Sequence, residues 1–104
     1  MKVKNLKGSS ANNPGPTCKC ENWLKHWDIN RYPKGDKKAG WCRGCRMKIE
    51  HAQLNGAHVI KVDSSDKNHY IIPLCDSCHG KINEEYEVDK DDLVSANCSL
   101  CINK

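Results

Sequence analysis

The clearest alternation of apolar and polar positions lies in the middle of the chain. Residues 57–62 (AHVIKV) alternate and are rich in β-branched side chains, which predicts a strand. Residues 63–68 (DSSDKN) have the composition of a turn, and residues 69–74 (HYIIPL) predict a second strand. Two strands joined by a short polar segment form a β-hairpin, so we expect a hairpin here.

Helical segments are predicted on both sides of this hairpin. Two tryptophans and a leucine give residues 21–27 an apolar edge, which a short helix could bury. A second helix can begin at or just after Asp76, because aspartate favours a helix N-terminus. Residues 88–94 are expected to form a loop or a short helical turn.

The remaining segments have the composition of irregular chain. Residues 1–17 are rich in Asn, Ser, Gly and Pro, so we expect a flexible N-terminal arm. Residues 28–40 are polar and contain Pro and Gly, which predicts a loop. The rest of the chain, 18–104, is expected to be a single domain, because 104 residues rarely make two.

Composition limits how large a core this domain can build. Hydrophobic residues make up 38% of the chain, eight of them are cysteines, and there is no phenylalanine. Small domains with so little apolar material usually need covalent or metal cross-links. A large enzyme core, a cofactor-enclosing barrel and a coiled coil are therefore excluded.

The eight cysteines occur as four close pairs. No apolar leader follows the basic N-terminus and no apolar run is long enough to cross a membrane, so we expect a cytoplasmic protein without membrane association. Thiols stay reduced in that compartment, which favours metal sites over disulfides. Short pairs suit tetrahedral zinc. The pairs are Cys18 and Cys20, Cys42 and Cys45, Cys75 and Cys78, and Cys98 and Cys101.

Two structural zinc ions are therefore expected. The first would be bound by the two central pairs, and the second by the two outer pairs, which would join the N- and C-terminal segments. His26 lies six residues after Cys20 and is an alternative to Cys98 in the second site. Closing a loop this long would remove much entropy from the unfolded chain. The members are Cys42, Cys45, Cys75 and Cys78 for zinc 1, and Cys18, Cys20, Cys98 and Cys101 for zinc 2.

The order of these features indicates a fold class. A cysteine knuckle at 41–46 precedes the hairpin, and a helix opened by Cys75 and Cys78 follows it. One zinc held between a knuckle and a helix N-terminus is the arrangement of a treble clef. We expect a small α+β zinc-stabilised fold, a treble clef with a second zinc site joining the terminal segments.

The central segment resembles the HNH endonuclease family, whose members build a ββα-metal unit. The matching residues are GAHVI at 56–60, Asn68, and LCDSCH at 74–79, and the resemblance covers residues 42–81 within an HNH-like core at 41–87. It is also similar to small HNH-related proteins of bacteria and phages. The resemblance implies nucleic-acid binding and metal-dependent cleavage.

Site residues follow from the resemblance. It implies that His58 is the general base, that His79 binds a catalytic Mg²⁺ or another divalent ion, and that Asn68 fixes the geometry of His58 or of the hairpin. Active members usually carry Asp before the base, where this chain has Ala57. The missing oxygen ligand predicts weak or absent cleavage and leaves open whether the protein is an enzyme.

Charge distribution supports a nucleic-acid partner better than net charge does. The formal net charge of +4 would fall to near zero with eight thiolates and two zinc ions. Residues 25–48 nevertheless hold eight basic side chains against two acidic ones, whereas residues 84–92 are strongly acidic. The expected phosphate contacts, to DNA or RNA, are Lys34, Lys37, Lys38, Arg43, Arg46 and Lys48. The alternative is a non-catalytic zinc-stapled adaptor that binds a protein partner.

Overall fold

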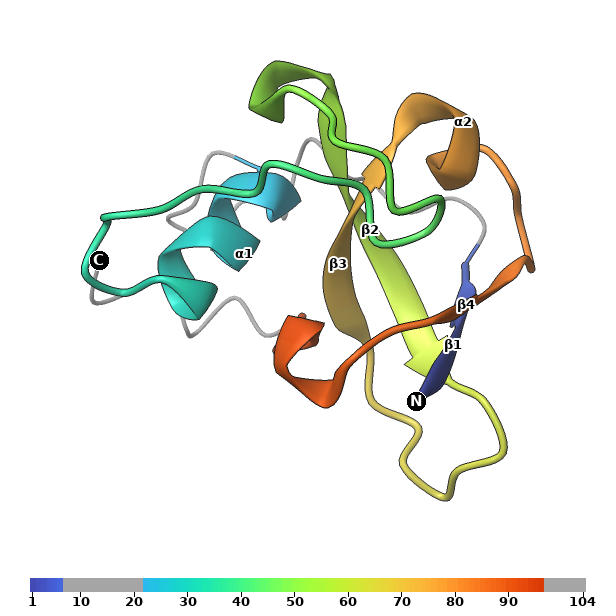
Figure 1. Ribbon diagram of the computed structural model, residues 1–104. Coiled ribbons are helices and arrows are strands. Elements are labelled where there is room, and N and C mark those ends of the chain that lie inside the picture. The colour runs from blue at the N-terminus through green and yellow to red at the C-terminus, as the bar shows by residue number, and fades with distance from the viewer. Residues whose placement is uncertain (7–21, 97–104) are drawn as a thin grey trace.

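The computed structural model describes residues 1–6 and 22–96, which form a small α+β fold around an antiparallel sheet (Figure 1). Within these residues two α-helices and two short 3-10 helices accompany the strands. In chain order the elements are β1 (Lys2–Asn5), α1 (Trp23–Arg31), η1 (His51–Gln53), β2 (Leu54–Lys61), β3 (Tyr70–Cys75), α2 (Asp76–His79), β4 (Glu85–Glu87), η2 (Lys90–Asp92) and β5 (Val94–Ser95).

The β2–β3 hairpin lies at the centre of the sheet. The strand order is β4-β1-β2-β3-β5, and each neighbouring pair is antiparallel. In the hairpin register His58 lies opposite Ile71 and Leu54 opposite Cys75. The predicted hairpin is confirmed, but β2 begins at Leu54, three residues earlier than the alternation indicated.

The first strand differs from the expected arm. Residues Lys2–Asn5 pair with β2 on one side and β4 on the other. Val3 and Asn5 are fully buried, so alternate side chains of this short strand point into the protein. A strand with a single apolar residue gives almost no hydrophobic pattern, which is why composition favoured an irregular arm. Residues 7–17 of that arm lie outside the described part of the chain.

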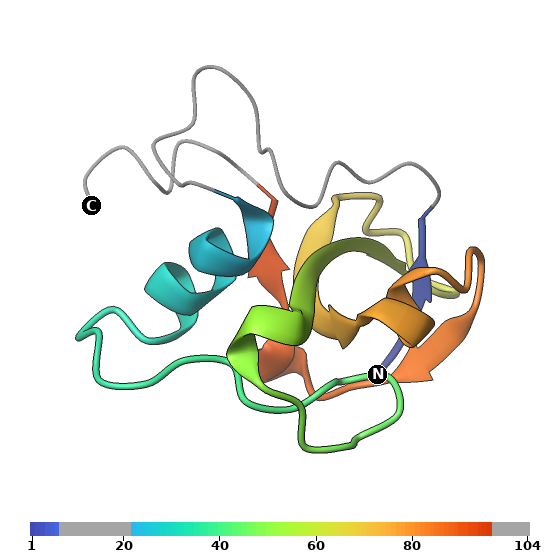
Figure 2. The same ribbon diagram turned by 90° about the horizontal axis from the view of Figure 1, so that it is seen from above.

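Helix α1 extends beyond the predicted segment. The Asn22 side chain accepts a hydrogen bond from the Lys25 backbone N–H at 2.8 Å and caps the helix N-terminus. The helix continues to Arg31, so the expected loop begins at Tyr32. Figure 2 shows α1 alongside the strands, and its first turn lies directly on Gly56 of β2, where a Cβ atom would approach the backbone to 2.4 Å.

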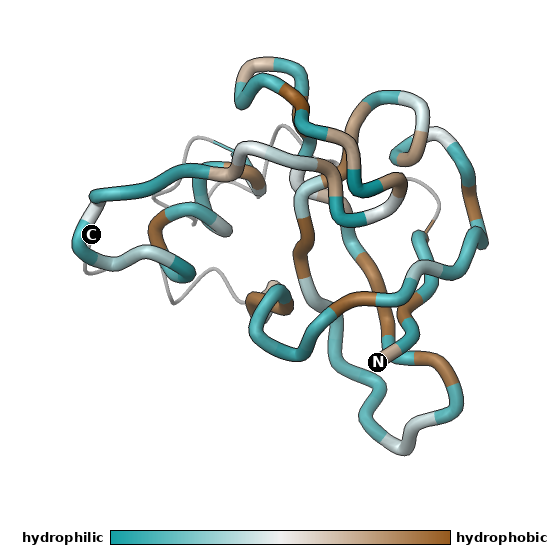
Figure 3. The backbone as a smooth tube through the Cα atoms, viewed as in Figure 1, coloured by the Kyte–Doolittle hydropathy of each residue, from teal (hydrophilic) through white to brown (hydrophobic). Residues whose placement is uncertain are grey.

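Apolar side chains of the sheet and of α1 form one core. Figure 3 shows apolar positions along the central strands, whereas the connecting loops are largely hydrophilic. The largest side chains with no exposure include Trp27, Ile71, Ile72, Leu74 and Val59. No helix within residues 1–6 and 22–96 is long and apolar enough to span a membrane.

Candidate metal centre

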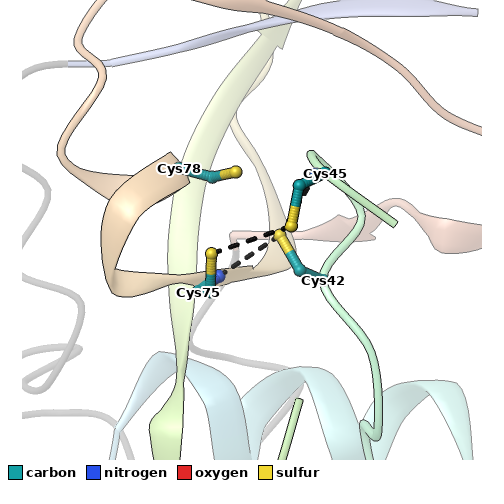
Figure 4. A group of neighbouring side chains, drawn as sticks. All are labelled: Cys42, Cys45, Cys75 and Cys78. Atoms are coloured by element: carbon teal, nitrogen blue, oxygen red, sulfur yellow. Dashed lines mark hydrogen bonds between the residues drawn. The ribbon is translucent and has the colours of Figure 1, made fainter. Parts of the chain in front are cut away.

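Four cysteines from two separate segments converge at one end of the hairpin. Cys42 and Cys45 lie in the turn closed by the Trp41–Lys48 β-bridge, whereas Cys75 ends β3 and Cys78 lies in α2. Figure 4 shows the four sulfur atoms pointing toward one another. All four lie within 4.8 Å of each other, and the Cys45 and Cys75 sulfurs are 3.9 Å apart.

These distances fit one tetrahedral ion. Four sulfurs at about 2.3 Å from a zinc ion lie about 3.8 Å from one another. The set contains only sulfur ligands, which suits zinc better than a hard cation such as Mg²⁺. The sequence-predicted members of the first site are therefore brought together at a spacing that one zinc ion can occupy.

Backbone N–H groups prepare Cys42 for the thiolate form. Its sulfur accepts hydrogen bonds from the N–H groups of Gly44 at 3.3 Å, Cys45 at 3.5 Å and Cys75 at 3.3 Å. Burial alone would raise the pKa of Cys42, but these donors outweigh it and lower the pKa to about 7. Cys42 therefore loses its proton more readily than an unperturbed cysteine thiol does.

The fourth thiol needs a cation in order to ionise. Burial, with the adjacent Cys42 thiolate as a further cause, raises the pKa of Cys78 to about 12. Four thiolates this close together repel one another, so the metal-free cluster keeps several protons. A bound divalent ion favours the deprotonated thiolates instead, because its positive charge directly compensates the charges on the sulfur atoms.

Strands β1 and β4 hold α2, and with it Cys78, in place. Tyr86 donates its hydroxyl hydrogen to the Cys78 carbonyl at 2.9 Å. The fully buried Asn5 side chain donates to the carbonyls of His79 at 2.8 Å and Lys81 at 3.0 Å. These bonds satisfy backbone acceptors at the end of a one-turn helix that could not persist alone.

The knuckle passes so close to α2 that only glycine fits at position 44. A Cβ atom there would lie 2.9 Å from Cε1 of Tyr86 and 3.0 Å from the Cys78 sulfur. The glycine between the paired cysteines thus permits the approach of the two halves of the site.

Arg43 is a structural residue of this knuckle, which corrects its expected role as a phosphate contact. Its side chain is 3% exposed and its Nε lies 3.1 Å from Oδ1 of Asp92. The guanidinium carbon is 3.6 Å from the ring centroid of Trp41, and Nη1 donates to the Trp41 carbonyl at 3.0 Å. A guanidinium that is buried and paired in this way cannot reach a phosphate at the surface.

The other five expected phosphate contacts are exposed. Three lie on the segment after α1, one ends the knuckle and one follows it. Arg46 donates from Nη2 to the Glu87 carbonyl at 2.8 Å, beside the acidic β4 strand. The exposed members are Lys34, Lys37, Lys38, Arg46 and Lys48.

His58 is half-buried on β2 against the ring of Trp23, at a centroid distance of 4.8 Å. Its Nδ1 atom is buried and has no hydrogen-bond partner among the described residues. Burial, assisted by the neighbouring His69, lowers its pKa to about 4. The imidazole is therefore neutral at neutral pH.

The other residues implied by the HNH resemblance occupy different positions. Asn68 is exposed on the loop between β2 and β3, where its backbone N–H donates to Oδ1 of Asp66 at 2.9 Å. His79 ends α2, and burial lowers its pKa. Within the described ranges, the four cysteines are the one cluster of three or more ligating side chains. His79 lies near enough to His58 to contribute, after burial and His69, to the lowered pKa of that imidazole.

The expected second zinc site falls mostly outside the described chain, because Cys18, Cys20, Cys98 and Cys101 all lie there. Its alternative ligand, His26, is fully buried in α1, and its Nε2 lies 2.7 Å from the Ser95 carbonyl. Since a carbonyl only accepts, Nε2 carries the hydrogen. Burial lowers the pKa of His26, which favours the neutral ring.

Several residues that shape the site carried no functional signal in the sequence. Asn5 sits in a segment that composition marked as irregular, and Arg43 was grouped with surface lysines. Gly44 offered one usable hint, because a glycine inside a cysteine pair often marks a tight metal-binding turn.

Comparison of the chain with protein-family models, curated proteins and solved structures finds no match. The HNH-like resemblance therefore stays a prediction from the sequence.

Proposed function

We propose that this protein is a zinc-stabilised nucleic-acid-binding protein in which the metal is structural. One observation carries the metal assignment: four cysteine sulfurs lie within 4.8 Å of one another, which is enough to fill all four positions around a tetrahedral ion. A catalytic zinc keeps one position open for water or substrate, whereas a structural zinc is closed by protein ligands. The centre therefore joins the knuckle to α2.

The treble-clef assignment is part of this proposal. A bridge-closed cysteine turn, the β2–β3 hairpin and a helix that begins at Asp76, directly after Cys75, follow one another in the chain. Each end of that unit supplies two sulfurs to the same cluster. This arrangement supports a treble clef, in which the metal replaces a larger apolar core.

Nucleic-acid binding is supported by the exposed basic side chains that follow α1. Residues 33–38, which we call the basic loop, carry Lys34, Lys37 and Lys38 with Asp36 as the only acid. Exposed lysines that lie close together on a short loop can contact phosphates, and each such contact releases counterions from the nucleic acid. Because Arg43 is buried, five of the six expected phosphate contacts are left at the surface.

Binding without cleavage agrees best with the environment of His58. A base with a pKa of about 4 accepts a proton poorly at neutral pH. Ala57, the residue before this histidine, is fully buried and its methyl side chain offers no oxygen ligand to a second ion. These features favour a binding role for the hairpin.

The nucleic-acid proposal is tested by fluorescence anisotropy with labelled duplex DNA and single-stranded RNA over a salt series. We expect micromolar or weaker binding whose logarithm falls with the logarithm of salt by about 0.9 per phosphate contact on duplex. Combined Lys37→Glu and Lys38→Glu should weaken binding and flatten this slope. Combined Lys67→Glu and Lys90→Glu, at exposed lysines outside the basic loop, is the charge-matched control and should have little effect. Binding that is insensitive to salt, or equal in both variants, would contradict the proposal.

Catalysis is tested separately by plasmid cleavage with added Mg²⁺ or Mn²⁺. The expected result is no cleavage above background. Robust cleavage by the wild type that disappears in His58→Ala would contradict binding without catalysis and assign endonuclease activity.

A protein adaptor is the second candidate, because apolar side chains are exposed on the knuckle. Met47 is 61% exposed and Trp41 is 37% exposed. Absence of nucleic-acid binding in the anisotropy assay would favour this candidate.

We further propose that a second zinc ion joins the terminal segments, as the cysteine spacing predicts. Native mass spectrometry should then find two zinc ions per chain. Cys98→Ser separates the two ligand sets, because the second ion should be lost if Cys98 is a ligand and retained if His26 takes its place. One zinc ion per wild-type chain would contradict the second site.

A further inference from the structure

A cleft of about 670 Å³ lies between α1, the basic loop and the start of β2. Its volume is within the usual range for small-molecule sites, about 300–1,000 Å³. This α1–β2 cleft is lined by none of the four clustered cysteines. It is a separate feature that zinc binding does not explain.

The unbalanced charge in the cleft is positive. Lys37 and Lys38 of the basic loop line it together with Lys25 of α1, and Asp28 is the one acidic residue of the lining. The Asp28 carboxylate is already satisfied, because Oδ1 accepts the Ala39 N–H at 2.8 Å and Oδ2 lies 2.5 Å from Nε2 of His51. Its side chain is only 11% exposed. A ligand therefore meets the lysines rather than the acid, which favours an anion.

The wall of the cleft is apolar and contains an aromatic ring. Leu24, Ile29 and Leu54 line it together with Tyr32, whose ring packs edge-on against Trp27 at 5.6 Å. Lys37 lies 5.9 Å from the Tyr32 ring centroid, so cation and ring face the same space. An inorganic anion alone would leave this apolar wall without contact.

Polar groups set into the wall distinguish between organic anions. Asn55 and His51 line the cleft beside the apolar side chains. The Asn55 amide N–H already donates to Oδ1 of Asp76 at 2.7 Å, and Nε2 of His51 is bonded to Asp28, so among the described residues the Asn55 carbonyl oxygen and the His51 Nδ1 atom are left to meet a ligand. An alkyl chain packed there would cover these groups without offering hydrogen bonds, which costs free energy. A planar heterocycle presents both an apolar face and a polar edge, so it suits this lining better than a lipid tail does.

We propose that the α1–β2 cleft binds a nucleoside phosphate unit. Lys37 and Lys38 contact the phosphate, while the base lies against Tyr32 and Leu24 with its edge toward Asn55 and His51. If the unit belongs to a nucleic-acid strand, this inference rests on the proposed function and names the part of the strand that is recognised. A free nucleotide offers the same chemistry.

Amide NMR titration of the full-length, zinc-loaded protein tests the cleft directly. The probes are adenosine monophosphate, adenosine, ribose 5-phosphate and a 5′-phosphorylated single-stranded tetranucleotide. Adenosine monophosphate should shift the amides of Leu24, Ile29 and Ala52. Adenosine and ribose 5-phosphate should each bind about tenfold more weakly, because each lacks one half of the contacts. Equal affinity of all three small ligands would overturn the proposal.

Substitutions in the basic loop provide the matched control. Combined Lys37→Ala and Lys38→Ala should weaken binding of adenosine monophosphate by about tenfold or more, since both charge-assisted contacts are lost. Lys34→Ala should change it by less than about twofold, because Lys34 lies on the same loop but does not line the cleft. An equal effect of the two changes would overturn the assignment.

The outcomes separate this inference from the proposed function. Shifts with adenosine monophosphate but no binding of any oligonucleotide would keep the cleft, identify a free nucleotide as the source and contradict nucleic-acid binding. Oligonucleotide binding without shifts at the cleft, and no response to adenosine monophosphate, would overturn the inference and leave the proposed function standing.

Discussion

Replacing Gly44 by alanine should weaken metal binding at the four-cysteine cluster without changing any ligand. The added Cβ would lie 2.9 Å from Cε1 of Tyr86, 3.0 Å from the Cys78 sulfur and 3.1 Å from the Cys78 Cβ. Neither neighbour can easily move, because the Tyr86 hydroxyl is bonded to the Cys78 carbonyl and Cys78 belongs to the four-cysteine cluster. The knuckle must therefore retreat from α2.

The size of the expected loss in metal affinity follows from the crowding around position 44. Forcing one extra methyl group into a close-packed site costs about 1–3 kcal/mol. If that strain is present only when the four sulfurs are drawn around the ion, it appears as a loss of about 5–150-fold in metal affinity. Gly44 does not have a positive φ, so the alanine itself adds no backbone strain.

Competition with a chromophoric chelator measures the affinity, and the thiolate-to-metal absorption of the cobalt-substituted protein reports the geometry. Gly40→Ala is the matched control, because a Cβ at Gly40 meets nothing within 4 Å. The control should keep wild-type affinity. Equal metal affinity of the two variants would refute the argument that close approach at Gly44 completes the site.

Three further predictions concern stability. Asn5→Ala should lower the free energy of unfolding by about 2 kcal/mol or more in urea titrations, because two backbone carbonyls at the end of α2 lose their donor. Arg43→Met should cost about 3–5 kcal/mol in the same assay, because it leaves the buried carboxylate of Asp92 unpaired, and adding Asp92→Asn should recover part of the loss. Burial lowers the pKa of His58 from 6.5 to about 4, so the unfolded chain binds more protons between these values and stability should fall as the pH decreases through that window. His58→Phe should reduce this pH dependence at fixed zinc concentration, and an unchanged pH profile would contradict the buried, neutral imidazole.

The strength of the local pattern explains which elements the sequence could predict. The hairpin was predictable because several β-branched residues alternate on both strands. β1 was not, since Val3 is its one apolar residue and its neighbours in the sheet come from residues 59–61 and 85–87. α1 runs past its apolar edge to Arg31, where the Tyr32 N–H donates to the Asp28 carbonyl, and such backbone bonds leave no hydrophobic signal in the sequence.

The candidate site likewise has some features that the sequence could predict and others that it could not. Close cysteine pairs are local chelating units, so their spacing anticipated the convergence of Cys42, Cys45, Cys75 and Cys78. Roles that depend on distant partners could not be anticipated. In the folded protein Arg43 is buried in an ion pair with Asp92. Asp28, which lines the α1–β2 cleft, pairs with His51. Each pairing depends on the tertiary fold and leaves no trace in residue spacing.

The central claim is that Cys42, Cys45, Cys75 and Cys78 together hold one structural zinc ion. Native mass spectrometry of the zinc-loaded protein, compared with the Cys45→Ser and Cys75→Ser double variant, tests it most directly. Each side of the cluster loses one sulfur in this variant, whereas the outer cysteines are untouched. We expect the loss of one zinc ion per chain relative to the wild type, together with a large loss of protection in amide hydrogen exchange around α2. An unchanged zinc content would contradict it.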